Sequence, residues 1–157
     1  KYDLAEEDIV RLLIEVPDLI EEARRAFDTS EIKDENIRRV IETIFRLRSE
    51  KRWLNENIIA QEISDPQLSS IVANLLSVRI DDMSEPEKLL SDCIVLLKVR
   101  DKNDRISAIM AELKGLQKDD ARSTELLKEY ATLRDEVDAI RKEKFINRID
   151  HGDELEF

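Results

Sequence analysis

The sequence predicts an all-α protein: an N-terminal multi-helix bundle, then a long connecting helix, then a C-terminal antiparallel helical hairpin. Turn signals of the kind that punctuate β-sheet proteins are scarce, because the 157 residues include only two glycines and three prolines. Charged residues make up 40% of the chain and aromatic residues only 4%, and Leu, Ile, Glu, Lys and Arg are abundant. Such a composition is typical of helical proteins.

Four helices are predicted in the first part of the bundle. Asp3 is placed to cap the first helix, with Glu6 at the capping-box position, and Pro17 separates this helix from a short second one. Asp34 is the expected cap of a longer third helix and Asn55 of a short fourth. The third helix has the clearest apolar face, formed by Ile37, Val40, Ile41, Ile44, Phe45 and Leu47.

Two further helices are predicted before the hairpin tip. Asp65-Pro66 is a strong start signal, and the helix that follows it extends to about Val78. The next helix begins at Ser84 and meets no helix breaker until Gly115. Residues 100–105 of this long helix include no apolar side chain, so we expect one continuous helix that is exposed to solvent for over a turn. A break between two helices at Asn103 is the alternative.

The two predicted hairpin helices each have one narrow apolar seam. In the second helix the seam follows alternating steps of four and three residues, at Leu126, Tyr130, Leu133, Val137, Ile140 and Lys144. In the first helix the expected seam is Ile106, Met110, Leu113 and Gln117, with Ile109 and Leu116 beside it. The tip, around residues 118–122, offers Asp119 or Asp120 as a cap. Two such seams can close on each other while most of both helices faces water.

The predicted boundaries divide the chain into a bundle at residues 1–99, a hairpin at 100–145 and an acidic, frayed tail at 146–157. Residues 1–97 hold 13 Lys and Arg against 22 Asp and Glu, whereas residues 98–145 hold 12 against 11. No part has the basic excess of a protein that neutralises several phosphates, so we expect no direct nucleic-acid binding. Lys1 in place of a starting methionine indicates a fragment of a longer protein.

Residue patterns for catalysis are missing from the sequence. Cys93 is the single cysteine and lies in an apolar helical context, and the single histidine, His151, lies in the acidic tail. A nucleophilic thiol, a metal site and a glycine-rich phosphate loop are therefore not expected, and neither is a cofactor. Every apolar run is short and interrupted by charge, which argues against a membrane span and favours a cytoplasmic protein.

Arginines and the single tryptophan form a group that has two interpretations. Arg39, Arg46 and Trp53 follow one another at intervals of seven residues, so a continuing helix would place them near one face. This face could bind an anion or the tail of a protein. In the alternative, Trp53 fills the bundle interior and the arginines pair with Glu42, Glu50 and Glu56.

Four motifs in order resemble the C-terminal domain of bacterial DNA primase. The segment 5–19 resembles the domain's A-E-x-x-L-L-x-L-L-x-x-x-P-x-L start, and Asp65-Pro66-Gln67-Leu68 is similar to its D-P-x-L helix start. Segment 90–94 is similar to the L-x-D-C-L of its long connecting helix, and the hairpin with Glu125-Leu126-Leu127 also fits. The likeness spans roughly residues 4–145.

The resemblance implies a monomeric, non-catalytic domain that binds the N-terminal domain of the hexameric replicative helicase. The primer-making active site would then lie in upstream domains of the parent primase. In some family members the domain also binds the acidic tail of single-stranded DNA-binding protein. On this hypothesis the hairpin carries the helicase contacts, and the residues expected to make them are Ile109, Leu116, Leu127, Tyr130 and Phe145.

Three other interpretations of the chain's function remain open from the sequence alone. The N-terminal domain of the replicative helicase has a related helical architecture, but its small-residue pattern L-G-x-x-L is replaced here by Val10-Arg11-Leu12-Leu13. A coiled-coil module would pair the seams between chains and self-assemble. Segment 133–140 also resembles the L-R-x-x-I-D-x-I of helical chorismate mutases, which would make the chain an enzyme.

Overall fold

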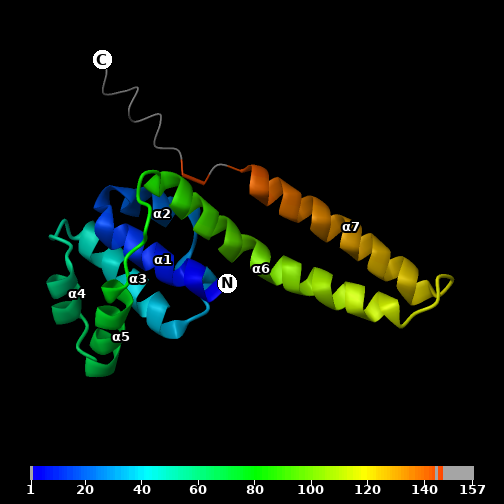
Figure 1. Cartoon of the computed structure of the whole chain (residues 1–157), viewed down its shortest axis with the longest axis horizontal. Helices are drawn as coiled ribbons and strands as arrows, with labels where there is room; N and C mark the ends of the chain where they lie inside the picture. The colour runs from blue at the N-terminus through cyan, green and yellow to red at the C-terminus, as the bar shows by residue number, and fades with distance from the viewer. Residues whose placement is uncertain (1, 144, 147–157) are drawn as a thin grey trace, which may run out of the picture. The chain divides into compact units, whose positions relative to one another are not determined.

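The computed structural model describes residues 2–143 and 145–146, and every regular element in this part of the chain is a helix. The α-helices are α1 (Tyr2–Glu15), α2 (Ile20–Ala26), α3 (Glu35–Ser49), α4 (Glu56–Glu62), α5 (Pro66–Ser77), α6 (Pro86–Lys114) and α7 (Ala121–Lys142), with short 3₁₀ helices η1 (Pro17–Leu19) and η2 (Thr29–Glu31). The predicted all-α class is confirmed (Figure 1).

The chain forms two compact units. The first, here called the bundle, contains the residues up to Leu97 together with Phe145 and Ile146, and the second, here called the hairpin, is Lys98–Glu143. These boundaries lie two residues before the predicted ones at each junction. Phe145 and Ile146 pack with the apolar core of the bundle, so Phe145 is not a hairpin residue and Ile146 is not frayed. Residues 147–157 of the predicted tail lie outside the described residues.

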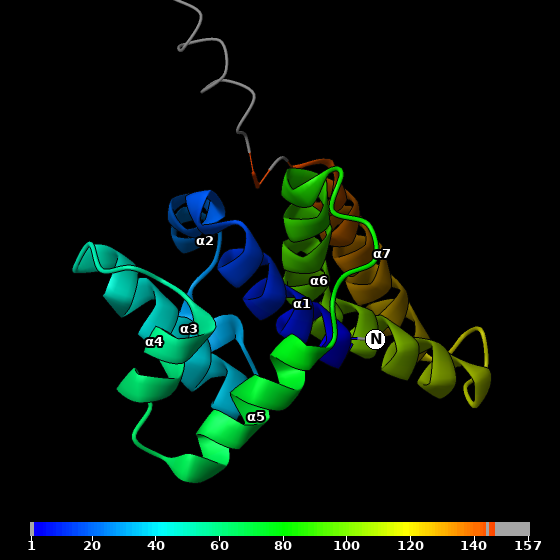
Figure 2. The ribbon, with the colours of Figure 1, turned by 60° about the vertical axis from the view of Figure 1, so that its left-hand side comes forward.

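In the bundle, α1 contacts α3 and α5, and α4 also contacts both α3 and α5 (Figure 2). Its core is mostly aliphatic, with Ile9, Leu12 and Leu13 of α1 fully buried. The predicted inward face of α3 is confirmed, because Ile37, Val40, Ile41, Ile44 and Leu47 are all buried. Burial of this apolar surface stabilises the bundle by about 25 cal/mol for each Å² that is removed from water.

Three predicted helix caps of the bundle are found where the sequence placed them, whereas Asp3, the predicted cap of the first helix, lies inside α1. Asp34 accepts hydrogen bonds from the backbone N–H groups of Asn36 and Ile37 at 2.9 and 3.1 Å. Asn55 accepts from Ile58 N–H at 2.9 Å and Asp65 from Gln67 N–H at 2.9 Å. Each bond satisfies a donor that the first helical turn leaves without a partner.

Glu6 is an exception, because it does not form the predicted capping box of the first helix. Helix α1 already begins at Tyr2, which turns Glu6 onto the buried face three residues before Ile9. The Glu6 carboxylate instead accepts hydrogen bonds from the backbone N–H groups of Lys33 and Asp34 at 2.7 and 3.1 Å. It therefore ties α1 to the segment that begins α3.

Arg11 makes a second long-range polar contact inside the bundle. Its side chain is buried, its Nε donates to the carbonyl oxygen of Leu75 at 2.9 Å, and its Nη1 donates to Asp8 at 2.8 Å. The bond to Leu75 satisfies a carbonyl in the last turn of α5, a position where helices lack intrahelical donors. Arg11 thus fixes α5 against α1.

Helix α6 is continuous over 29 residues, so the predicted single helix is confirmed and the break at Asn103 is wrong. It belongs to both units, since the bundle ends at Leu97 and the hairpin begins at Lys98. The expected solvent exposure of residues 100–105 is only partly correct. Arg100 is buried, which the long apolar stem of an arginine allows.

Candidate functional site

In the hairpin, α6 and α7 run antiparallel to each other (Figure 1). Each helix contributes one seam of buried side chains, and the two seams belong to the same chain. On α7 the predicted seam residues Leu126, Tyr130, Leu133, Val137 and Ile140 are buried or half-buried, and Ser123 is buried in line with them. The last predicted seam position, Lys144, lies outside the described residues. On α6 the buried or half-buried positions include Val99, Ile106, Ile109 and Leu113, and the half-buried Leu116 continues the series two residues past the end of the helix. The α7 series, and the α6 series from Ile106 onward, alternate steps of three and four residues, the spacing of an antiparallel coiled coil.

The seam that begins on α6 differs from the predicted one at two of its four positions, where Ile109 takes the place of Met110 and Leu116 takes the place of Gln117. Ile109 has no exposed surface, whereas Met110 is 49% exposed. Ile106, Ile109, Leu113 and Leu116 form an equally regular series, and it buries branched aliphatic side chains in place of Met110 and Gln117. The prediction that Met110 belongs to the seam is therefore wrong, and so is the expectation that Ile109 lies beside it.

The five residues predicted to contact the helicase have different surroundings. Ile109 is fully buried in the seam, and Leu116 and Tyr130 are half-buried along it. Leu127 is 55% exposed on α7, and Phe145 lies in the bundle. Among these residues only Leu127 offers most of its side chain to a partner, and Met110, which was not among them, offers a similar area.

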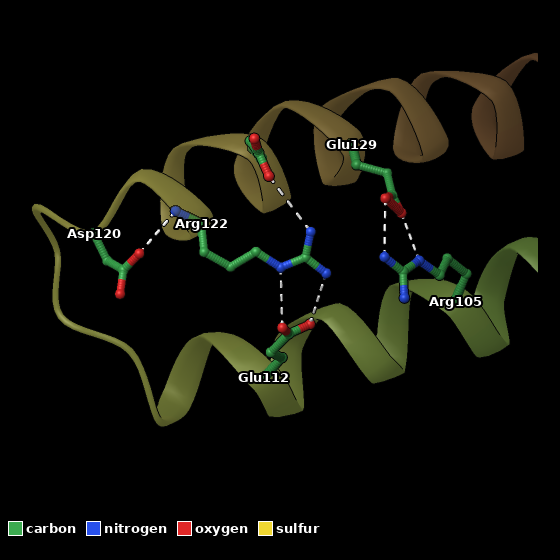
Figure 3. A network of polar contacts seen from close by, with 6 residues as sticks. Arg105, Glu112, Asp120, Arg122 and Glu129 are labelled. Carbon is green, nitrogen blue, oxygen red and sulfur yellow. Dashed lines mark hydrogen bonds and ion pairs between the residues drawn. The ribbon is translucent and has the colours of Figure 1, made fainter.

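One side of the hairpin is closed by ion pairs between the helices. Arg105 donates two hydrogen bonds to Glu129, one of them from Nη2 at 2.9 Å, and Arg122 donates to Glu112 at 3.1 and 3.4 Å (Figure 3). Lys102 pairs with Glu136 at 2.7 Å. The hydrogen bonds from Arg105 lower the pKa of Glu129, and those to Glu112 raise the pKa of Arg122.

The hairpin tip is closed by short polar contacts. Asp120 caps α7 by accepting a hydrogen bond from Arg122 N–H at 2.8 Å, so of the two predicted caps Asp120 is the one used (Figure 3). The hydroxyl of Ser123, which is buried, donates to the carbonyl oxygen of Gln117 at 2.9 Å. These bonds help to fix the register in which α7 packs antiparallel to α6.

A second candidate surface surrounds Trp53 in the bundle. Trp53 is 84% exposed, so the interpretation that it fills the bundle interior is wrong. A surface recess of about 570 Å³ beside it is walled by the apolar residues Val16, Pro17 and Leu54. Helix α3 ends at Ser49 and therefore does not carry Trp53 onto the face of Arg39 and Arg46, which the predicted seven-residue spacing required.

Charged residues around this recess differ in how they are paired. Arg52 forms ion pairs with Glu62 and Glu50, and Arg46 also pairs with both of these glutamates. Glu50 was a predicted partner, while Glu62 takes the place of Glu42 and Glu56. Arg48 and Lys51 also line the recess, and neither makes an ion pair within the described part of the chain.

Lys51 has a left-handed backbone conformation, with φ of 58°. It follows the last turn of α3, where Arg52 N–H donates to the carbonyl oxygen of Leu47 at 3.0 Å in a typical helix C-terminal motif. Glycine is the usual residue at this position, because a side chain costs about 1 kcal/mol there. A lysine at this position therefore contributes a cation to the recess at a cost in backbone strain.

The thiol of Cys93 does not provide a reactive group. Cys93 is buried, and burial raises its pKa to about 12, with the charges of Asp8 and Asp92 adding to the effect. The thiol is therefore protonated at neutral pH, whereas a cysteine nucleophile requires the thiolate. His151, the other candidate for such chemistry, lies outside the described residues.

Within residues 2–143 and 145–146, no group of three or more His, Cys, Asp and Glu side chains is arranged to hold a metal ion. None of the helices in this range combines the length and apolar character needed to cross a membrane. Comparison with known protein families, curated proteins and solved structures finds no match to this chain.

Proposed function

We propose that this chain is a non-catalytic docking module that binds the N-terminal domain of the hexameric replicative helicase through its hairpin. The observation that carries this proposal is that the apolar residues of the hairpin fall into two groups, one buried in the seam and one exposed to solvent. The seam residues hold α6 and α7 together, while Met110 and Leu127 remain 49% and 55% exposed. Exposed apolar side chains on a rigid helical element favour a protein contact over a pocket for a small molecule.

The resemblance to the C-terminal domain of bacterial primase supplies the partner in this proposal. Its four motifs lie on helices that follow one another in the expected order, and the D-P-x-L motif begins α5. The segment with Cys93 lies in α6, which continues into the hairpin. By placing the catalytic domains of the parent primase beside the helicase, such a module would direct primer synthesis to the replication fork.

Direct binding to the replicative helicase of the organism that encodes the chain tests this proposal. In sedimentation velocity, the free chain is expected to behave as a monomer at micromolar concentration and to move with the hexamer when the two are mixed. A chain that dimerises and does not bind the hexamer would favour the coiled-coil self-assembly module. A chain that sediments alone as a monomer would also contradict the proposal.

We further propose that the recess beside Trp53 binds the acidic tail of single-stranded DNA-binding protein. An exposed tryptophan with Val16, Pro17 and Leu54 offers apolar contact area, and Arg48 and Lys51 offer positive charge for carboxylates. The strained backbone at Lys51 also favours a functional cation, because a glycine would be more stable there.

Trp53 reports on this second proposal directly, because it is the single tryptophan of the chain. Titration with a synthetic peptide of the acidic tail is expected to shift the Trp53 emission to shorter wavelength in a saturable manner. Lys51→Gly should weaken peptide binding roughly tenfold while keeping or raising stability, because glycine tolerates the left-handed conformation. Arg24→Ala, which removes an exposed cation on α2, is the control, and equal effects of the two substitutions would contradict the assignment.

A further inference from the structure

The two flanks of the hairpin have opposite character. We call the flank with Arg105, Glu112, Arg122 and Glu129 the paired flank, because its charges satisfy one another across the helices (Figure 3). Arg105 and Glu112 lie one residue before the buried Ile106 and the half-buried Leu113, respectively. Charges that are already engaged in ion pairs have less to gain from a partner, since a new contact must first break the existing one.

Met110 and Leu127 lie on the opposite flank of the hairpin. Met110 follows Arg105 by five residues and precedes Glu112 by two, so at about 100° per residue it is turned roughly 140–160° from both. Leu127 has the same relation to Arg122 and Glu129. Because the ion pairs join the helices on one side, both exposed apolar residues share the other side. We call this surface the open flank.

Cations without ion pairs flank Met110 and Leu127 on this surface. Lys114 lies one helical turn after Met110, and Arg134 and Arg141 lie seven and fourteen residues after Leu127. All three are exposed, and none makes an ion pair within the described residues. The carboxylate that shares this flank is Asp138. The open flank is therefore apolar at its centre and positive around it, although the whole hairpin is nearly neutral.

We propose that the open flank binds an amphipathic helix with an acidic rim from the partner protein, laid along the hairpin as a third helix. Its apolar residues would pack on Met110 and Leu127, and its Asp and Glu side chains would pair with Lys114 and Arg134. A helix fits because the side-chain ridges of one helix pack into the grooves between the ridges of its neighbours, so a third helix can lie along a pair of antiparallel helices. This inference rests on the proposed docking function and assigns it to one flank.

Apolar and charge substitutions on the open flank test this inference. We expect Met110→Ala/Leu127→Ala to weaken binding of the helicase N-terminal domain by at least about tenfold, because exposed anchors dominate the energy of such interfaces. Arg134→Glu should weaken binding to a similar extent at low salt and make it less sensitive to salt. Alanine and glutamate both favour helices, so the hairpin should keep its far-UV circular dichroism.

Matched controls lie on the outer face of α7. Lys128→Glu makes the same charge change as Arg134→Glu, at a position turned about 120° from it. Lys128→Ala/Asp135→Ala removes two exposed side chains without changing net charge. Both controls are expected to bind within about twofold of the unchanged chain. If they weaken binding as strongly as the open-flank variants, the assignment to one flank is wrong.

The outcomes also separate this inference from the docking function itself. Loss of binding on removal of the hairpin, combined with full binding by the open-flank variants, would overturn the open flank alone. Full binding in both cases would overturn the docking function as well. Binding of the chain to anionic lipid vesicles that requires Met110, Leu127 and Arg134 would also overturn the protein helix as occupant, since the flank would then recognise a membrane surface.

Discussion

A chain whose hairpin is shortened is expected to lose helicase binding while its bundle remains folded. Replacing residues 104–134 by four Gly and Ser residues removes Met110, Leu127 and the tip. Lys102 and Glu136 pair at 2.7 Å, so Asn103 and Asp135 face each other at the cut. A linker of four residues spans roughly 13 Å at most, which suffices for helices that pack about 8–10 Å apart.

The expected loss of affinity is at least about a hundredfold, because the whole proposed contact surface is removed. Retention of Phe145 and Ile146 is essential to the design, since both pack with the bundle core and simple truncation would remove them. Circular dichroism and thermal unfolding of the variant provide the control for the bundle. A folded variant that binds the helicase as tightly as the unchanged chain would exclude the hairpin as the contact surface.

Substitution of Glu6 by alanine is expected to destabilise the bundle by about 2–4 kcal/mol. The buried carboxylate accepts hydrogen bonds from the backbone N–H groups of Lys33 and Asp34, and its loss leaves both donors without this acceptor. A hydrogen bond to a charged group contributes about 1.5–3 kcal/mol, and partial access of water to the two donors offsets some of the loss. Glu6→Gln should have a smaller effect, because the amide oxygen can still accept one of the two bonds.

Chemical denaturation of these variants in the shortened-hairpin background measures the effect on the bundle alone. Glu7→Ala is the matched control, because Glu7 is the neighbouring carboxylate and makes only a 3.5 Å ion pair with Arg11. Such a contact contributes less than about 1 kcal/mol. Equal free energies of unfolding for Glu6→Ala and Glu7→Ala would show that the carboxylate does not hold α1 to the start of α3.

Local signals in the sequence predicted the helices well. The caps at Asp34, Asn55 and Asp65 depend on residues two or three positions apart, and the structure contains all of them. The seam of α7 was also predictable, because Leu126, Tyr130, Leu133, Val137 and Ile140 offer a single regular apolar series. These features are determined within one or two helical turns.

Features that depend on distant contacts were harder to predict. On α6, Ile109 and Met110 are adjacent apolar residues, so the local pattern admits two seams, and the choice between them depends on packing against α7. Nothing in the local sequence indicates that Phe145 returns to the bundle core, or that Glu6 bonds to Lys33 and Asp34. The position of Trp53 depends on the left-handed turn at Lys51, a conformation that lysine rarely adopts.

The central claim is that the hairpin uses its seam to stay folded and presents one flank to a partner. Hydrogen–deuterium exchange of the chain, alone and bound to the helicase N-terminal domain, tests this claim most directly, because it reports local opening segment by segment. We predict slower exchange on binding in residues 104–134, with exchange in α1–α5 unchanged. Slower exchange in α1–α5 with the hairpin unchanged would contradict the claim.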